Sequence, residues 1–440
     1  MPALDALAPR LIRIAVLTAA SSLASVAQGA DQLQTGAGNS RAIGLASASP
    51  LVQSARKILV DRLRDIRSSQ LRTNLTELMD KDKACIRHRA GLQDANKQRI
   101  VEQLTAAGLM DPADGASIEG GLIAGVFPGI EADGSDCPRM PQAFFSAPGG
   151  ATGGHHSEPG GLPVHEAFNG RSAASLAKNY RTVYGSSDKA GFPTLAPPDL
   201  MRPEKKHQPF VIDEDIVAAA PLWHDWAKTI VFQWNADGTE FRELNFGGNG
   251  KTDNNGAAGD SKTGAHHILG LAEALKRGMP ADFVLTVASA HANPTYGNEY
   301  KVVNWIRAAS IIAQIDPFAQ GYLRRDDKGA PRLPSLRQLG SMDLNAASGS
   351  EPNVLLEYVL HNLSDADYIF TGPAASTVAV VLEKLAPEYG YDSKQLDYLF
   401  KYRHVAFTYL SAERLFVEYS NGGLDAVRAE LDKLRKRKLI

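Results

Sequence analysis

The chain has 440 residues, of which 44% are hydrophobic and 22% charged, the composition of an ordinary globular protein. The length allows about two to four domains. A formal net charge of −2 excludes a global positive field that would draw the chain to nucleic acid or to anionic lipid. We therefore predict no nucleic-acid partner.

The N-terminus has the pattern of a secretory signal peptide. Arg10 and Arg13 precede an uncharged stretch, 14–30, that ends in small side chains. This stretch is too weakly apolar for a permanent span of about 20 residues, and we expect no stable membrane span later in the chain. We predict that residues 1–30 are a signal peptide and that the protein is exported, periplasmic or secreted in a bacterium. An ordinary amphipathic first helix is the alternative.

The chain has only two cysteines, Cys85 and Cys137. In an oxidising compartment such a pair can form a disulfide. Two buried free thiols are the alternative, and the sequence does not decide between them.

The first half of the mature chain divides by composition. Residues 31–49 are small and polar and are typical of a flexible linker. Residues 50–145 form an N-terminal helical region, because Leu51, Ala55 and Leu59 recur at four-residue steps opposite charged side chains. The Gly- and Pro-rich loop that follows marks a domain boundary.

Residues 150–320 are expected to form a second, helical domain. Its predicted helices are Leu162–Tyr184, Asp213–Thr229, Ala265–Arg277, Ala281–Ala290 and Tyr300–Ile315. Two short segments, Ile230–Trp234 and Glu240–Leu244, flank the turn sequence Asn235–Gly238 and predict a small β-hairpin insertion. A C-terminal helical extension, 321–440, completes a mostly α fold with extra helices at both ends.

Histidine and aspartate occur in an order that indicates a metal site. The candidate ligands each lie in or at the end of a predicted helix: His165, His224, Asp225, His266 or His267, His291 and Asp316. Rigid helices of a bundle can direct such side chains to one point. Imidazole and carboxylate together favour manganese, iron, nickel or zinc over calcium. We therefore predict one or two divalent transition-metal ions.

The pair His224-Asp225 has an informative context. An apolar helix abruptly places His224, Asp225 and Lys228 together. Burying these charges without partners would cost several kcal/mol. A metal ion, with a phosphate near Lys228, would compensate that cost.

This ordered set resembles the HD-domain superfamily of metal-dependent phosphohydrolases. Its signature is a histidine on one helix, an HD doublet on the next and a distant aspartate, with two further histidines in two-metal members. Segment 155–165 also resembles the HH…GGL…H start of a bacterial exoribonuclease branch, and 222–228 is similar to the family's LHDxxK. Trp226-Ala227 replaces the usual small residues of HDIGK. The resemblance covers about His155 to Pro317.

The resemblance implies a HD-type helical bundle and a six-ligand, two-metal centre. The first metal would be held by His165, His224, Asp225 and Asp316. Asp225 would bridge to a second metal held by His266 and His291. His266 is preferred because Gly270 matches the family's H-x-x-x-G, and His267 is the alternative.

It also implies hydrolysis of a phosphomonoester or phosphodiester by metal-activated water. Asp225 and Lys228 would be the catalytic residues, with Lys228 neutralising phosphate charge. Lys228, His156 and Asn293 are the predicted contacts to a small phosphorylated substrate or nucleotide. The alternatives are an HD-type di-iron oxygenase and a non-catalytic metal-binding scaffold. The sequence leaves the substrate and the oligomeric state open.

Overall fold

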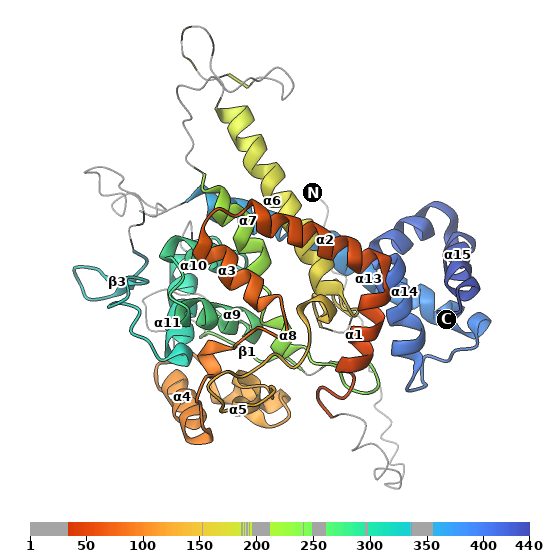
Figure 1. Cartoon of the computed structure of the whole chain (residues 1–440), viewed down its shortest axis with the longest axis horizontal. Helices are drawn as coiled ribbons and strands as arrows, with labels where there is room; N and C mark the ends of the chain where they lie inside the picture. The colour runs from red at the N-terminus through yellow and green to blue at the C-terminus, as the bar shows by residue number, and fades with distance from the viewer. Residues whose placement is uncertain are drawn as a thin grey trace, which may run out of the picture.

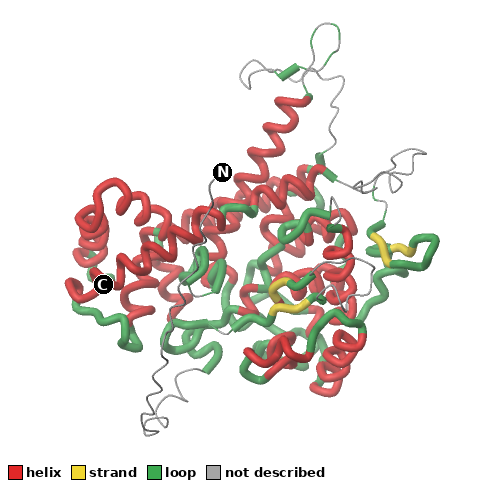
Figure 2. The backbone as a smooth tube through the Cα atoms, turned by 180° about the vertical axis from the view of Figure 1, so that it is seen from behind, coloured by secondary structure: helices red, strands yellow, loops and turns green. Residues whose placement is uncertain are grey.

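The computed structural model describes residues 34–440 except 152, 186–187, 189, 191, 193, 196–211, 241, 249–260, 295–297, 335 and 337–354. The predicted signal peptide lies outside these residues. The described chain is mostly α-helical, which confirms the predicted fold class (Figures 1 and 2). Its strands form two short antiparallel pairs, β1 (Asn245–Phe246) with β2 (Thr263–Gly264) and β3 (Arg324–Arg325) with β4 (Pro331–Arg332).

The N-terminal region is helical, as predicted. Its helices are α1 (Asn39–Ala48), α2 (Pro50–Asp65), α3 (Ser69–Leu78), α4 (Asp94–Ala106) and α5 (Gly121–Val126). Ser49 caps α2 by accepting a hydrogen bond from the Val52 N–H, and Pro50 occupies the first turn, where no N–H is needed. Ala55 and Leu59 lie on the buried face of α2.

Helix α1 occupies residues that were predicted to be a linker. Ala42 is fully buried and packs with Trp234 and Phe400. The Asn39 side chain donates to the Pro141 carbonyl and accepts from the Trp234 N–H. Small side chains let α1 approach the rest of the protein closely, and this packing cannot be inferred from local composition.

The middle of the chain supplies the helices around the candidate site. They are α6 (Gly161–Tyr184), α7 (Glu214–Trp223), α8 (Lys228–Val231), α9 (Ala265–Lys276), α10 (Ala281–Ala288) and α11 (Glu299–Ala313). Helix α6 packs against α2 and α7, and α9 packs against α11 (Figure 1). Every residue from Ala265 to Leu275 is buried, so α9 is a central helix of the main core. These positions confirm the helices predicted at α6, α9, α10 and α11.

Two local predictions were wrong around residues 224–244. The predicted helix Asp213–Thr229 is interrupted by a turn at 224–227, after Pro221 inside α7. The predicted hairpin is reduced to one bridge, between Trp234 and Glu240, because Ile230 and Val231 belong to α8. Ile230 and Val231 are buried on all sides, and such a short apolar run fits a helical turn as well as a strand.

The C-terminal region is also helical, with α12 (Leu356–Ser364), α13 (Tyr368–Leu385), α14 (His404–Leu410) and α15 (Ala412–Lys436). Helices α13, α14 and α15 share a separate apolar core at one end of the molecule (Figure 1). One described stretch, Leu356–Tyr389, has the length and apolar composition of a membrane span, a property that the core helices of soluble proteins share.

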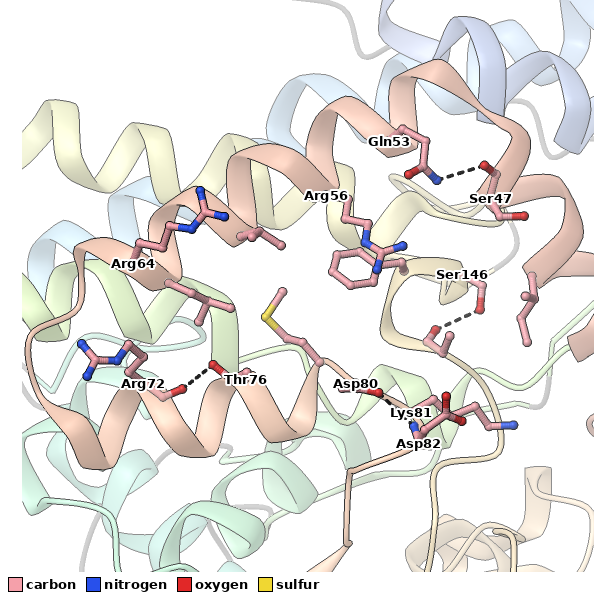
Figure 3. Close-up of a pocket in the computed structure, with 16 residues that line it drawn as sticks. Ser47, Gln53, Arg56, Arg64, Arg72, Thr76, Asp80, Lys81, Asp82 and Ser146 are labelled. Carbon is pink, nitrogen blue, oxygen red and sulfur yellow. Dashed lines mark hydrogen bonds between the residues drawn. The ribbon is translucent and has the colours of Figure 1, made fainter.

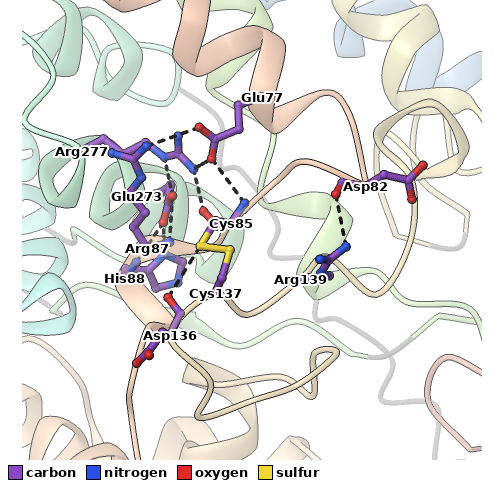
Figure 4. The surroundings of a disulfide bond; sticks show 10 residues. All are labelled: Glu77, Asp82, Cys85, Arg87, His88, Asp136, Cys137, Arg139, Glu273 and Arg277. Atoms are coloured by element: carbon purple, nitrogen blue, oxygen red, sulfur yellow. Dashed lines mark hydrogen bonds and ion pairs between the residues drawn. A yellow bond between two sulfur atoms is a disulfide. The ribbon is translucent and has the colours of Figure 1, made fainter.

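Cys85 and Cys137 form a disulfide, which decides between the two alternatives left by the sequence (Figure 4). A buried polar network lies beside it. The Glu273 carboxylate accepts from the Arg87 and His88 backbone N–H groups and lies 2.7 Å from His88 Nδ1. The disulfide joins two segments of the N-terminal region, and the Glu273 network fastens that region to α9.

Candidate metal centre

Four of the six predicted metal ligands line one cavity, and a fifth, His224, lies directly behind it against Asp225. His165 is on α6, His224 ends α7, Asp225 lies in the following turn, and His266 begins α9. His291 follows α10. The cavity has a volume of about 570 Å³, within the range of small-molecule sites. These buried groups of histidine and acidic side chains can hold a metal ion.

One set of donors surrounds the Asp365 carboxylate. Asp365 Oδ1 lies 3.0 Å from Nε2 of His165 and 3.0 Å from Nε2 of His224. Asp225 Oδ2 lies 3.4 Å from each of the same two nitrogens. Two imidazoles and two carboxylates thus meet at one point, a donor set that suits a transition metal.

A second set uses the other oxygen of Asp225. Asp225 Oδ1 lies 3.3 Å from His266 Nε2, and the His266 and His291 ring centroids are 5.2 Å apart. Ligand atoms of Asp225, His266 and His291 all lie within 4.8 Å of one another. Asp225 therefore faces both sets, with one carboxylate oxygen toward each.

The outer nitrogen of each histidine is held by another group. His165 Nδ1 lies 3.2 Å from Asp367 Oδ1, and His266 Nδ1 pairs with the Glu243 carboxylate. His224 Nδ1 donates to the Pro221 carbonyl at 3.0 Å, and His291 Nδ1 lies 2.7 Å from Thr263 Oγ1. In metal sites such outer partners orient the imidazole and leave Nε2 for the ion.

Several inner atoms lack hydrogen bonds of normal geometry. Among the described residues, three such atoms are buried and make no hydrogen bond of normal geometry: His165 Nε2, His266 Nε2 and Asp225 Oδ1. Buried polar atoms without partners are costly and rare in native proteins. A cation in each of the two sets would satisfy these atoms, so the residues present fit a metal.

Electrostatics indicate the same need for positive charge. Burial alone lowers the pKa of His224, but Asp225, Glu166 and Asp365 outweigh it and raise that pKa to about 10. Burial raises the pKa of Glu166 to about 8. Burial also opposes ionisation of Asp225, yet His224 and Lys228 hold its pKa well below the usual value. His224 and Lys228 thus supply positive charge to the Asp225 carboxylate, a role that a metal ion could share.

Asp316, the sixth predicted ligand, is not brought to the cavity. Its side chain is exposed, and Oδ1 accepts from the Phe318 and Ala319 backbone N–H groups in the turn after α11. Asp365, between α12 and α13, takes the predicted position beside His165 and His224. No local sequence signal would have singled out Asp365.

The choice between His266 and His267 is resolved by geometry. His266 faces Asp225, as described above. The fully buried His267 ring stacks on His291 with centroids 4.1 Å apart and meets Trp305 edge-on at 4.8 Å. His267 therefore packs behind the cluster.

The predicted substrate contacts are placed differently. Lys228 lines the cavity, where Nζ pairs with Asp225 and donates to the Gly149 carbonyl. His156 lies behind the cavity, with Nε2 3.1 Å from Asp367 Oδ2, and its neighbour His155 lines the cavity instead. Asn293 is half-buried and is not among the described residues that line the cavity.

A second cavity, of about 500 Å³, lies between α1, α2 and α3 (Figure 3). Arg56, Arg64, Arg72 and Lys81 project around it, and Arg56 stacks on Phe145 at 4.8 Å. None of the described residues that line it is a histidine. Of these two cavities, the one around Asp225 is the one whose described lining combines histidine with carboxylate.

No family model matches this chain, and no curated protein or solved structure matches it either.

Proposed function

We propose that this protein is a metal-dependent phosphohydrolase with a two-metal centre of the HD type. One observation carries the proposal: Asp225 directs one carboxylate oxygen to His165 and His224 and the other to His266. A bridging carboxylate between two histidine-rich sets is the arrangement expected for a pair of metal ions. The four outer nitrogens held by protein groups support it.

In this proposal His165, His224, Asp225 and Asp365 hold the first ion. Asp225, His266 and His291 hold the second. Divalent ions there would neutralise phosphoryl oxygens and make water acidic enough to ionise near neutral pH. Hydrolysis then forms a bond from the water oxygen to phosphorus, breaks the bond from phosphorus to the alcohol oxygen, and leaves a proton on the alcohol.

The positive side chains of the cavity support an anionic substrate. Lys228, Lys262 and Lys301 all line it. Burial lowers the pKa of Lys228, but Asp225 raises it above its ordinary value, so the ammonium group stays charged. A phosphate seated between these lysines and the metal site would be neutralised from two sides.

Two features support a site of action outside the cytoplasm. The pattern of residues 1–30 favours export. A disulfide between Cys85 and Cys137 suits an oxidising compartment.

Metal analysis followed by a substrate panel tests the proposal. Protein purified without chelators should contain up to two manganese, iron, nickel or zinc ions and cleave phosphate esters, and Asp225→Ala should lose metal and activity together. Full metal content in Asp225→Ala would overturn the site assignment. Two irons with consumption of dioxygen, and no phosphate release, would instead identify an oxygenase.

A further inference from the structure

The mouth of the metal cavity carries an apolar rim at the junction of α12 and α13. Four large apolar side chains there are exposed to solvent: Leu363 at 48%, Tyr368 at 54%, Ile369 at 67% and Phe370 at 49%. Single exposed apolar residues are ordinary, but a group of them beside a cavity marks a binding surface.

The rim is continuous with the polar cavity. Leu363, Tyr368 and Ile369 line the same cavity as His165, and the Tyr368 ring lies 6.2 Å from the His155 ring. Asp365 is only two residues from Leu363 and three from Tyr368 in the chain. The turn that brings a carboxylate to the metal site therefore also brings the apolar side chains to its entrance.

Packing within the protein accounts for only part of this rim. The Phe370 ring meets the Phe416 ring edge-on, with centroids 5.8 Å apart. Tyr368 and Ile369 lie in the first turn of α13, before its buried face begins. Because Leu363, Tyr368 and Ile369 are exposed and line the cavity, their geometry indicates contact with a ligand.

We propose that the ligand of this site is an amphiphilic phosphate monoester, with its phosphate at the metal cluster and its alkyl or aryl group on Leu363, Tyr368 and Ile369. The inference rests on the proposed function and adds the class of alcohol that is removed. The three cavity lysines match the charged end, and the rim matches the apolar end. Burying each methylene of the ligand should tighten binding about four-fold.

The test uses the full chain saturated with Mn²⁺ and the non-hydrolysable methyl-, butyl- and octylphosphonate, below the concentration at which they form micelles. Calorimetry should show a Kd that falls by about ten-fold or more from methyl- to octylphosphonate. Ile369→Ser should reduce this ratio by at least about three-fold. Val380→Ser is the matched control, because Val380 is also on α13 and is also 67% exposed, and it should leave the ratio unchanged.

The outcomes separate the two proposals. The proposed amphiphilic class of ligand would be overturned by either of two results, whichever ester is cleaved. One is equal Kd values for methyl- and octylphosphonate, and the other is tighter binding of adenosine 5′-phosphate than of octylphosphonate. The expected chain-length dependence without cleavage of octyl phosphate by any loaded metal would overturn the hydrolase and leave an amphiphile-binding site. An equal effect of Ile369→Ser and Val380→Ser would also overturn the assignment of the rim.

Discussion

Asp365 Oδ1 lies 3.0 Å from His224 Nε2, although 141 positions separate the two residues in the chain. We therefore predict that Asp365→Ala loses bound metal and at least about 100-fold in activity, because a charged donor leaves the first set. Asp316→Ala is the matched control. Asp316→Ala removes only an exposed carboxylate that accepts two backbone hydrogen bonds in the turn after α11. The change should lower the free energy of unfolding by about 1 kcal/mol and should leave the metal content unchanged. The number of metal ions bound per chain, measured for both variants, tests this prediction. Loss of metal in Asp316→Ala but not in Asp365→Ala would make Asp316 the ligand.

The two neighbouring histidines of α9 should behave differently. His266→Ala removes the nitrogen that faces Asp225 Oδ1 and should lose the second metal equivalent while keeping the first. His267→Phe keeps a ring packed on His291 and Trp305 and should retain both equivalents. Elemental analysis after gel filtration measures both. Loss of metal in the His267 variant alone would exchange the two assignments.

Asp367 and Glu243, the carboxylates beside the outer nitrogens of His165 and His266, should each affect the affinity for a different metal ion. Asp367→Asn weakens the hold on His165 Nδ1, and Glu243→Gln weakens the hold on His266 Nδ1. Each change should lower the affinity for one metal equivalent by about 10- to 100-fold. Titration with a competing chelator resolves the two equivalents. If either variant weakened both equally, the division into two sets would be contradicted.

The disulfide should contribute measurably to stability. It closes a loop across a sequence separation of 52 residues, and chain-entropy estimates give such a bond about 4 kcal/mol. We expect the double variant Cys85→Ser, Cys137→Ser to lose about 2–4 kcal/mol in the free energy of unfolding, measured in urea. The native protein after full reduction should match the variant. Identical unfolding midpoints for oxidised and reduced protein would show that the bond does not form.

His404 should make the protein sensitive to acid. Burial and the nearby Arg403 lower the pKa of His404 to about 3, whereas in the unfolded chain that pKa lies near its ordinary value of 6.5. The unfolded state therefore takes up a proton that the folded state cannot, and the contribution to stability, complete above pH 6.5, is lost as pH falls toward 3. The slope is about 1.4 kcal/mol per pH unit.

His404→Gln can still donate to the Gly238 carbonyl, as His404 Nε2 does at 2.8 Å. Its stability relative to the native protein should improve by about 2 kcal/mol between pH 7 and pH 5. Urea unfolding at the two pH values measures this change. A difference that stays constant with pH would mean that His404 titrates normally in the folded protein.

Local sequence was sufficient where the signal itself is local. The helical period of the apolar side chains located α6, α9, α10 and α11, and the abrupt placement of His224, Asp225 and Lys228 on an apolar segment marked the cavity. Burial of such charges needs compensation wherever the segment packs, so a cluster of charged partners around them could be expected before the fold was known.

Sequence failed where long-range packing decides. Nothing local distinguishes Asp316 from Asp365, because both follow a helix, and only the packing of α12 against α6 and α7 carries Asp365 to the histidines. In the same way, residues of α1 were predicted as a linker. They form a helix because Ala42 and Asn39 contact Trp234, which is distant in the sequence.

The sequence alone thus determined the helical character and the placement of His224 and Asp225 on a buried segment, since residue type and period carry that information. The tertiary structure alone determined that Asp365 lies beside the histidines, that His266 and not His267 faces Asp225, and that an apolar rim lies at the cavity mouth. Each of these features depends on which distant helix packs beside the site, because a side chain can share a metal site only when its ligand atom lies within a few ångströms of the other ligand atoms.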